Sequence, residues 1–277
     1  MARQWGPVRA ALAQVSIRWP YVALSALFVF ASYGVLIQAW RLLLGGWGAR
    51  IGFWDGARIW TVSNLGKYVP GKVWQIGTMA VMAQQVGVPG VAAAGAALFS
   101  ALITLGSGLA VVALTGARLL PVPGGAATLL GLVLVGLLLA PLLLPKAAAL
   151  AARLTRREAV LPPLPASLIW AVFALSGAAW LLFGTGFHLL GLALTGAPLT
   201  SLTGSIAAFT ASYLAGFLAF FAPGGIGVRE VGMRAMLQVY GVPAATAIVM
   251  ALASRLWLTV LEIGPALVFL VRNPARR

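Results

Sequence analysis

The sequence predicts an all-α polytopic membrane protein with about five full spans and two helical hairpins broken at Pro-Gly. The composition is 61% hydrophobic and 8% charged, whereas soluble domains carry about a quarter charged residues. Several apolar runs are long enough to cross about 30 Å of hydrocarbon. Two Pro-Gly pairs interrupt other apolar segments, and at membrane depth such breaks are tolerated only inside protein or beside a wet cavity.

The charged residues are few and strongly unbalanced. Nineteen Lys and Arg against four Asp and Glu give a formal net charge of +15. Most basic residues fall between apolar runs, where cytoplasmic-loop bias and anionic lipid headgroups account for them, so no nucleic-acid partner is expected. With no Cys and one His, neither a disulfide framework nor a metal site is expected, and no cofactor is predicted.

The whole chain, 1–277, is predicted to be one membrane domain. Five segments are expected to be full spans: 21–44, 91–115, 126–145, 168–194 and 244–271. The first of them is too long for the core of a signal peptide and is interpreted as a retained span. Residues 1–19 place arginines and tryptophans among apolar residues, which is typical of an amphipathic segment at the membrane interface.

Each Pro-Gly pair is expected to end one helix and start another, because proline lacks an N–H and glycine tolerates positive φ. The first pair lies between arms 59–69 and 72–86, each short for a full crossing, so a re-entrant hairpin is predicted. The second lies between 202–221 and 225–240, and the first of these arms is long enough to cross alone. The residues assigned to the breaks are Pro70, Gly71, Pro223, Gly224, Gly225 and Gly227.

An internal repeat is visible after the two breaks. Residues 154 positions apart match: Met79, Met82, Gln84, Gly87, Val88 and Pro89 with Met233, Met236, Gln238, Gly241, Val242 and Pro243. Two units, 21–116 and 168–272, joined by the span 126–145, then each contain a span, a broken hairpin and a span. Three spans, an odd number, lie between the two hairpins, so the hairpins are predicted to enter the membrane from opposite sides. Such inverted repeats serve alternating access in many transporters.

The first break is surrounded by candidate substrate-binding residues. Lys67 and Lys72 flank it, and two ammonium groups beside the free amides of a new helix suit a lipid phosphate. The alternative is that both lysines extend to the membrane interface. Further candidates add hydrogen-bonding groups and an aromatic surface: Asn64, Tyr68, Trp74 and Gln75.

The helix after the second break begins with Arg229 and Glu230. A guanidinium can bind phosphate through two N–H groups, and a carboxylate near a helix N-terminus is favourable. These two residues are therefore also candidates for substrate binding. The alternative is a structural ion pair that keeps the hairpin folded.

The remaining charged residues predict a buried network of Arg234, Arg255 and Glu262. Arg255 and Glu262 lie two turns apart on one face of the last span, and neither is expected to face lipid. The expected pairs are Glu230 with Arg255, and Glu262 with Arg229 or a lysine of the first hairpin. A proton-coupling role for Glu262 stays open.

At the two breaks the sequence resembles the lysylphosphatidylglycerol synthase transmembrane-region family, also called flippase-like membrane proteins. The residues that carry the resemblance are Asn64, Gly66-Lys67-Tyr68-Val69-Pro70-Gly71-Lys72-Val73-Trp74 and Pro223-Gly224-Gly225-Ile226-Gly227-Val228-Arg229-Glu230. It covers nearly the whole chain and implies a multi-pass protein of the plasma (inner) membrane that moves a lipid or lipid-linked headgroup between leaflets. These 277 residues contain no soluble aminoacyl-transferase domain, so the synthase activity is not expected of them.

Three functions remain in competition at this stage. The first is a lipid flippase that moves an anionic phospholipid or a polyprenyl-phosphate-type lipid by alternating access. The second is a non-transporting membrane partner of a lipid or glycan synthesis complex. The third is a membrane-embedded lipid-modifying enzyme, which is disfavoured because the sequence has few acids and no metal motif. No oligomeric state is predicted.

Overall fold

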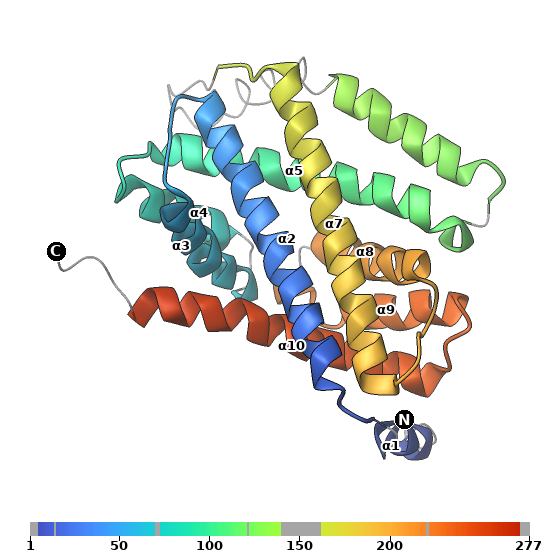
Figure 1. Ribbon diagram of the computed structural model, residues 1–277. Coiled ribbons are helices and arrows are strands. Elements are labelled where there is room, and N and C mark those ends of the chain that lie inside the picture. Colours follow the sequence, from blue (N-terminus) through green and yellow to red (C-terminus); the bar gives the residue numbers. More distant parts are fainter. Residues whose placement is uncertain are drawn as a thin grey trace.

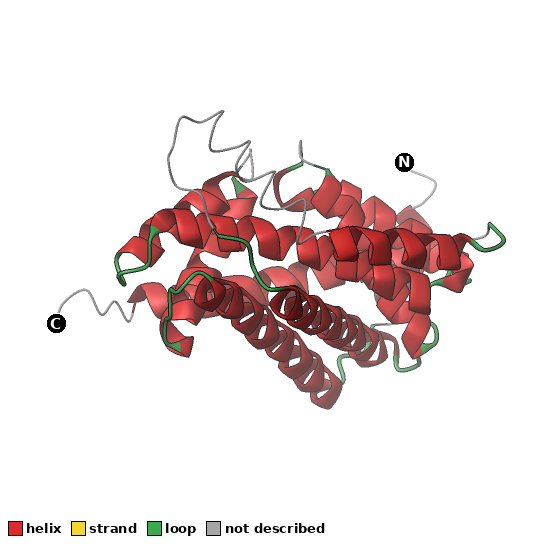
Figure 2. Ribbon diagram, turned by 90° about the horizontal axis from the view of Figure 1, so that it is seen from above, coloured by secondary structure: helices red, strands yellow, loops and turns green. Residues whose placement is uncertain are grey.

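The computed structural model describes residues 5–13, 15–69, 73–120, 122–139, 162–219 and 222–271, and in these ranges it consists of helices and loops (Figure 2). Four helices are long and apolar enough to cross a membrane: α2 (Trp19–Gly46), α5 (Gly90–Thr115), α7 (Ala166–Thr195) and α10 (Ala244–Val271). They coincide with four of the five predicted spans. The fifth, 126–145, overlaps a shorter apolar helix, Gly125–Leu139, and its end lies outside the described residues.

The other helices are shorter. They are α1 (Trp5–Ala13), α3 (Phe53–Asn64), η2 (Leu65–Tyr68), α4 (Val73–Gln84), η3 (Ala117–Leu119), α8 (Leu202–Leu218), η4 (Pro223–Gly225) and α9 (Val228–Val239). The helix before the first break therefore starts earlier than the predicted arm. Its first turn contains Asp55, whose negative charge is favourable at a helix N-terminus.

Helices α2 and α7 lie side by side and pass in front of α5 and α10 in the view of Figure 1. From above, they form a layer along one side of the molecule (Figure 2). Their contact is close because Gly186 carries no side chain: a Cβ there would lie 3.2 Å from the carbonyl oxygen of Ser25. The Ser25 hydroxyl donates to the Gly186 carbonyl at 2.7 Å. Small residues permit such approach between membrane helices.

The two broken hairpins also close through glycines. In the first, a Cβ on Gly66 would lie 2.7 Å from the backbone N of Gln75, so η2 and α4 pack backbone to backbone. Residues 70–72, with the predicted break residues Pro70 and Gly71, lie outside the described ranges. In the second, Gly224, Gly225 and Gly227 have positive φ, which only glycine adopts at little cost.

The connections that follow the hairpins have the same structure. Gly87 and Gly241 have φ values of 80° and 85°. The next residues, Val88 and Val242, donate their N–H to the carbonyl five positions earlier at 3.0 and 3.1 Å. The glycines donate to the carbonyl three positions earlier at 3.1 and 2.9 Å. Both helices α4 and α9 thus end in a Schellman motif.

The N-terminal segment contains a helix, α1, within the predicted interfacial region 1–19. It packs against α10. The residues after it satisfy carbonyls at the end of α7, since the N–H groups of Ser16 and Arg18 donate to Leu194 and Ala193 at 3.2 and 3.0 Å.

Candidate functional site

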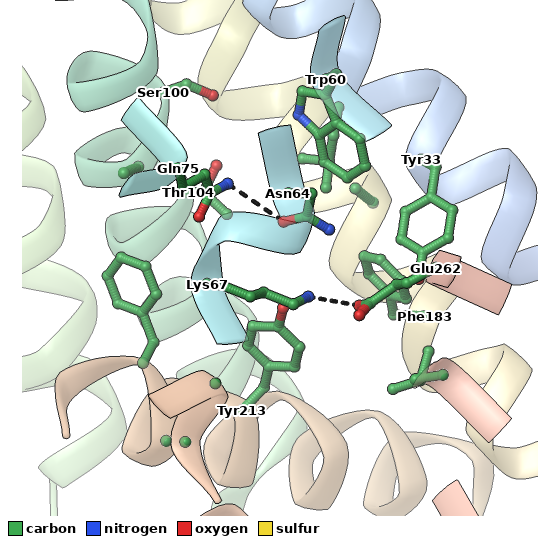
Figure 3. Close-up of a pocket in the computed structure, with 18 of the residues that line it drawn as sticks. Tyr33, Trp60, Asn64, Lys67, Gln75, Ser100, Thr104, Phe183, Tyr213 and Glu262 are labelled. Carbon is green, nitrogen blue, oxygen red and sulfur yellow. Dashed lines mark hydrogen bonds and ion pairs between the residues drawn. The ribbon is translucent and has the colours of Figure 1, made fainter. Parts of the chain in front are cut away.

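A cavity of about 200 Å³ lies where the two broken hairpins meet α5 and α10 (Figure 3). Most of the described candidate residues line it, although they come from distant parts of the sequence. They are Asn64, Lys67, Tyr68, Gln75, Gly224, Gly225, Arg229, Arg255 and Glu262.

Glu262 is held from the first hairpin. Its Oε1 lies 2.6 Å from Lys67 Nζ, and its Oε2 accepts a hydrogen bond from the Tyr68 hydroxyl at 2.6 Å. The residue is 8% exposed, and a buried carboxylate is tolerated only when it is paired and hydrogen-bonded. Because both oxygens have partners, helix α10 is tied to the tip of the first hairpin (Figure 3). The predicted pairing of Glu262 with a lysine of that hairpin is present.

Arg255 ties α10 to the second hairpin. Its Nη1 donates to the Gly224 carbonyl at 2.7 Å, and its Nε lies 3.6 Å from Glu230 Oε1. Glu230 Oε2 accepts the N–H of Gly227 at 2.6 Å, so this residue caps α9. Glu230 does not line the cavity, and its contacts are those of a structural ion pair and cap.

Arg229 is the most deeply buried arginine of the described residues, at 6% exposed. Its guanidinium lies over the ring of Tyr213, with 4.3 Å between Cζ and the ring centroid, and 5.4 Å from that of Phe209. Aromatic faces attract cations, but they leave N–H groups without an acceptor. The Nη2 atom of Arg229 is buried and has no hydrogen-bond partner in the described part of the chain.

Unpartnered buried donors are concentrated around the cavity. Four residues lining it have one among the described atoms: Tyr33 Oη, Trp40 Nε1, Arg229 Nη2 and Arg255 Nη2. All four groups can donate, and three can only donate. Buried polar groups are nearly always hydrogen-bonded, and each exception requires an explanation. This arrangement suits a ligand rich in acceptors, such as an oxyanion.

The charges of the residues that line the cavity also suit an anionic ligand. Among the described lining residues, three cations stand against the single carboxylate of Glu262. No group of three or more His, Asp or Glu that could hold a metal ion occurs in the described ranges.

Some predicted residues are not brought to the cavity. Trp74 is 57% exposed and outside the lining. Arg234 does not line the cavity either, and within the described ranges its Nε has no partner. Lys72 lies outside the described residues.

Sequence reasoning missed the aromatic part of the lining. The residues concerned come from α2, α3, α7 and α8, and they are Tyr33, Trp40, Trp60, Trp180, Phe183, Tyr213 and Phe217. Each is one of several aromatic residues on its helix, so only the packing of distant helices distinguishes it from lipid-facing or core positions.

Comparison with known proteins places the chain in a family. No curated protein matches the sequence. The family model described as "Lysylphosphatidylglycerol synthase TM region" matches residues 2–263, and the match therefore contains both hairpins and every described residue of the cavity. The protein belongs to the lysylphosphatidylglycerol synthase transmembrane-region family of multi-pass membrane proteins.

Proposed function

We propose that this protein is a flippase that moves a lipid with an anionic headgroup between the leaflets of the plasma (inner) membrane. The observation that carries the proposal is the buried guanidinium of Arg229, which lines the same cavity as three other described residues with an unpartnered buried donor. Cations inside a membrane protein are costly and mark functional sites. A phosphate would supply the missing acceptors and the missing negative charge.

The size of the cavity supports headgroup binding. About 200 Å³ is smaller than the roughly 300–1,000 Å³ of pockets that enclose a drug-sized ligand. A phosphate with a small substituent fits such a volume, whereas two acyl chains do not. In this proposal the acyl chains stay in the surrounding lipid while the headgroup passes through the protein.

The proposed mechanism is alternating access by two inverted repeats, with α2, α3, α4 and α5 corresponding to α7, α8, α9 and α10. Three features support it. The connections at Gly87 and Gly241 have the same hydrogen bonds. Helix α5 packs on α8, and its counterpart α10 packs on α3. The hairpin tips η2 and η4 meet each other. A rocking motion of one repeat against the other would expose the cavity to each side in turn.

The test is lipid exchange in proteoliposomes with the variant Arg229→Gln. We expect exchange of a labelled anionic lipid to fall about ten- to hundredfold, because one charge-assisted hydrogen bond of roughly 1.5–3 kcal/mol is lost. The control is Arg118→Gln, which removes an exposed arginine outside the cavity. Circular dichroism and size-exclusion elution report whether each variant is folded.

The other functions predict different results. A non-transporting partner predicts that Arg229→Gln exchanges lipid at the same rate as the wild type. A lipid-modifying enzyme predicts a new lipid product when the purified protein is incubated with candidate lipids. Either result would replace the flippase proposal.

A further inference from the structure

The two walls of the cavity differ in chemistry. The wall formed by the second hairpin and α10 carries Arg229 and Arg255. Among the described residues, α3, α4 and α5 contribute no charged side chain to the lining, and their amides and hydroxyls there, which form the neutral wall, are Asn64, Gln75, Ser100 and Thr104. Figure 3 shows these four residues gathered on one side of Lys67.

The neutral wall offers both donors and acceptors. Gln75 Nε2 donates to Asn64 Oδ1 at 3.2 Å. Each amide has one NH2 and one carbonyl group, so whichever way the two are turned, the pair leaves an NH2 group and a carbonyl oxygen for a ligand. The Ser100 hydroxyl has no protein partner among the described residues.

Hydroxyl groups match this wall, because each hydroxyl donates one hydrogen bond and accepts others. An ammonium group does not match it, since it only donates and carries a charge. The one carboxylate of the described lining, Glu262, already has both oxygens engaged by Lys67 and Tyr68.

The neutral wall lies at positions that correspond to the cationic wall. Gln75 and Arg229 are 154 positions apart in the sequence, and so are Ala101 and Arg255. All four residues line the cavity. The same offset relates the matching residues after each break, so the two repeats place different side chains on similar backbone positions around one cavity.

We propose that Asn64, Gln75 and Ser100 form a second subsite that selects lipids whose phosphate is esterified to a polyhydroxyl alcohol, such as glycerol or a sugar. The arginines bind the phosphate, and the neutral wall binds the hydroxyls of the esterified alcohol. The inference rests on the proposed function and adds the chemical class of the headgroup. Headgroups with a bare phosphate or an amine are disfavoured.

The test compares headgroups on identical labelled acyl chains in phosphatidylcholine vesicles. The labelled lipids are phosphatidylglycerol, phosphatidic acid and phosphatidylethanolamine. For the wild type we expect the fastest exchange with phosphatidylglycerol. In Gln75→Leu the ratio of phosphatidylglycerol to phosphatidic acid exchange should fall about five- to tenfold, the effect of one hydrogen bond. Gln84→Leu, on the exposed side of the same helix and outside the cavity, should leave the ratio unchanged.

A second variant tests the subsite if Gln75→Leu fails to fold. A binding measurement tests it if the protein does not transport lipid. Gln75→Arg gives the first repeat an arginine at the position that corresponds to Arg229 in the second. This variant should exchange phosphatidic acid faster relative to phosphatidylglycerol than the wild type does. Tryptophan fluorescence of the detergent-solubilised protein reports binding of glycerol phosphate and of inorganic phosphate, because Trp40, Trp60 and Trp180 line the cavity.

The outcomes separate the two proposals. An unchanged lipid ratio in both Gln75 variants, or a wild-type preference for phosphatidylethanolamine, overturns the subsite while transport stands. If the wild-type protein exchanges none of the three lipids faster than Arg229→Gln does, the flippase proposal fails. The fluorescence measurement of anion binding then tests the subsite by itself. A preference for glycerol phosphate that Gln75→Leu abolishes then supports it, and equal binding of both anions overturns it.

Discussion

At the scale of single residues, the described lining of the cavity contains one cation with a carboxylate partner, Lys67, and one buried cation with an unpartnered N–H group, Arg229. Lys67 and Glu262 neutralise each other at 2.6 Å, so this lysine is engaged by the protein itself. Among the described residues, the guanidinium of Arg229 lies over the rings of Tyr213 and Phe209, and its Nη2 has no hydrogen-bond partner. The ion pair therefore satisfies its own charges, whereas a buried N–H group of the guanidinium has no acceptor among the described residues.

The pairing predicts the effect of removing one partner. Glu262→Gln leaves Lys67, whose side chain is 16% exposed, without its counter-charge and should lower the free energy of unfolding by up to about 3 kcal/mol. Adding Lys67→Met to the same chain should recover part of this loss, because no isolated charge then remains. Thermal unfolding in detergent measures both variants. If Glu262→Gln alone is as stable as the wild type, the ion pair between Lys67 and Glu262 contributes little to stability.

At the scale of elements, the hairpins depend on backbone conformations that only glycine adopts easily. The Schellman motifs after the two hairpins require positive φ at Gly87 and Gly241. Each motif also buries the next residue, with Val88 at 3% and Val242 at 5% exposure. The two motifs fix the angle at which α5 and α10 leave the hairpins, and α5 and α10 both line the cavity.

Equivalent motifs predict equivalent costs of substitution. Gly87→Ala and Gly241→Ala should each lower stability by about 1–2 kcal/mol, because an L-residue at this φ is strained. The control is Gly177→Ala inside α7, where a Cβ meets nothing within 4 Å and helix propensity favours alanine. Chemical denaturation of the three variants gives the comparison. Clearly unequal costs at Gly87 and Gly241 would argue against equivalent connections.

At the scale of the whole molecule, α10 connects both hairpins. Glu262 holds the first tip and Arg255 holds the second, and the two residues are two turns apart on one helix. A movement of one repeat against the other would have to change these contacts together with the packing of α5 on α8. Contacts between the repeats are therefore the place to test alternating access.

A reversible cross-link tests this movement. The pair Phe28→Cys and Gly186→Cys joins α2 of the first repeat to α7 of the second, since a Cβ on Gly186 would lie 3.6 Å from the Cβ of Phe28, within the spacing of a disulfide. The natural sequence has no cysteine, so the bond is unambiguous. Oxidation should slow lipid exchange at least tenfold, and reduction should restore it.

The control cross-link lies within one repeat. Ala215→Cys and Gly232→Cys join α8 to α9, with 3.9 Å between the Cβ positions. It should form without slowing exchange, because the second hairpin moves as one unit in the proposed mechanism. Equal exchange by the oxidised and reduced forms of the first pair would contradict a rocking motion.

The sequence alone determined the membrane class, the four long helices and the matching glycine turns after the two hairpins, because apolar length, Pro-Gly pairs and matched residues are local signals. It also singled out Arg229, Arg255 and Glu262, since charge is rare in this chain. Only the tertiary structure decided which charges pair and which stay free, and that Tyr33 and Tyr213 join the cavity. Those relations depend on how α2, α7, α8 and α10 pack, and an apolar helix carries no local mark of the neighbour it will meet.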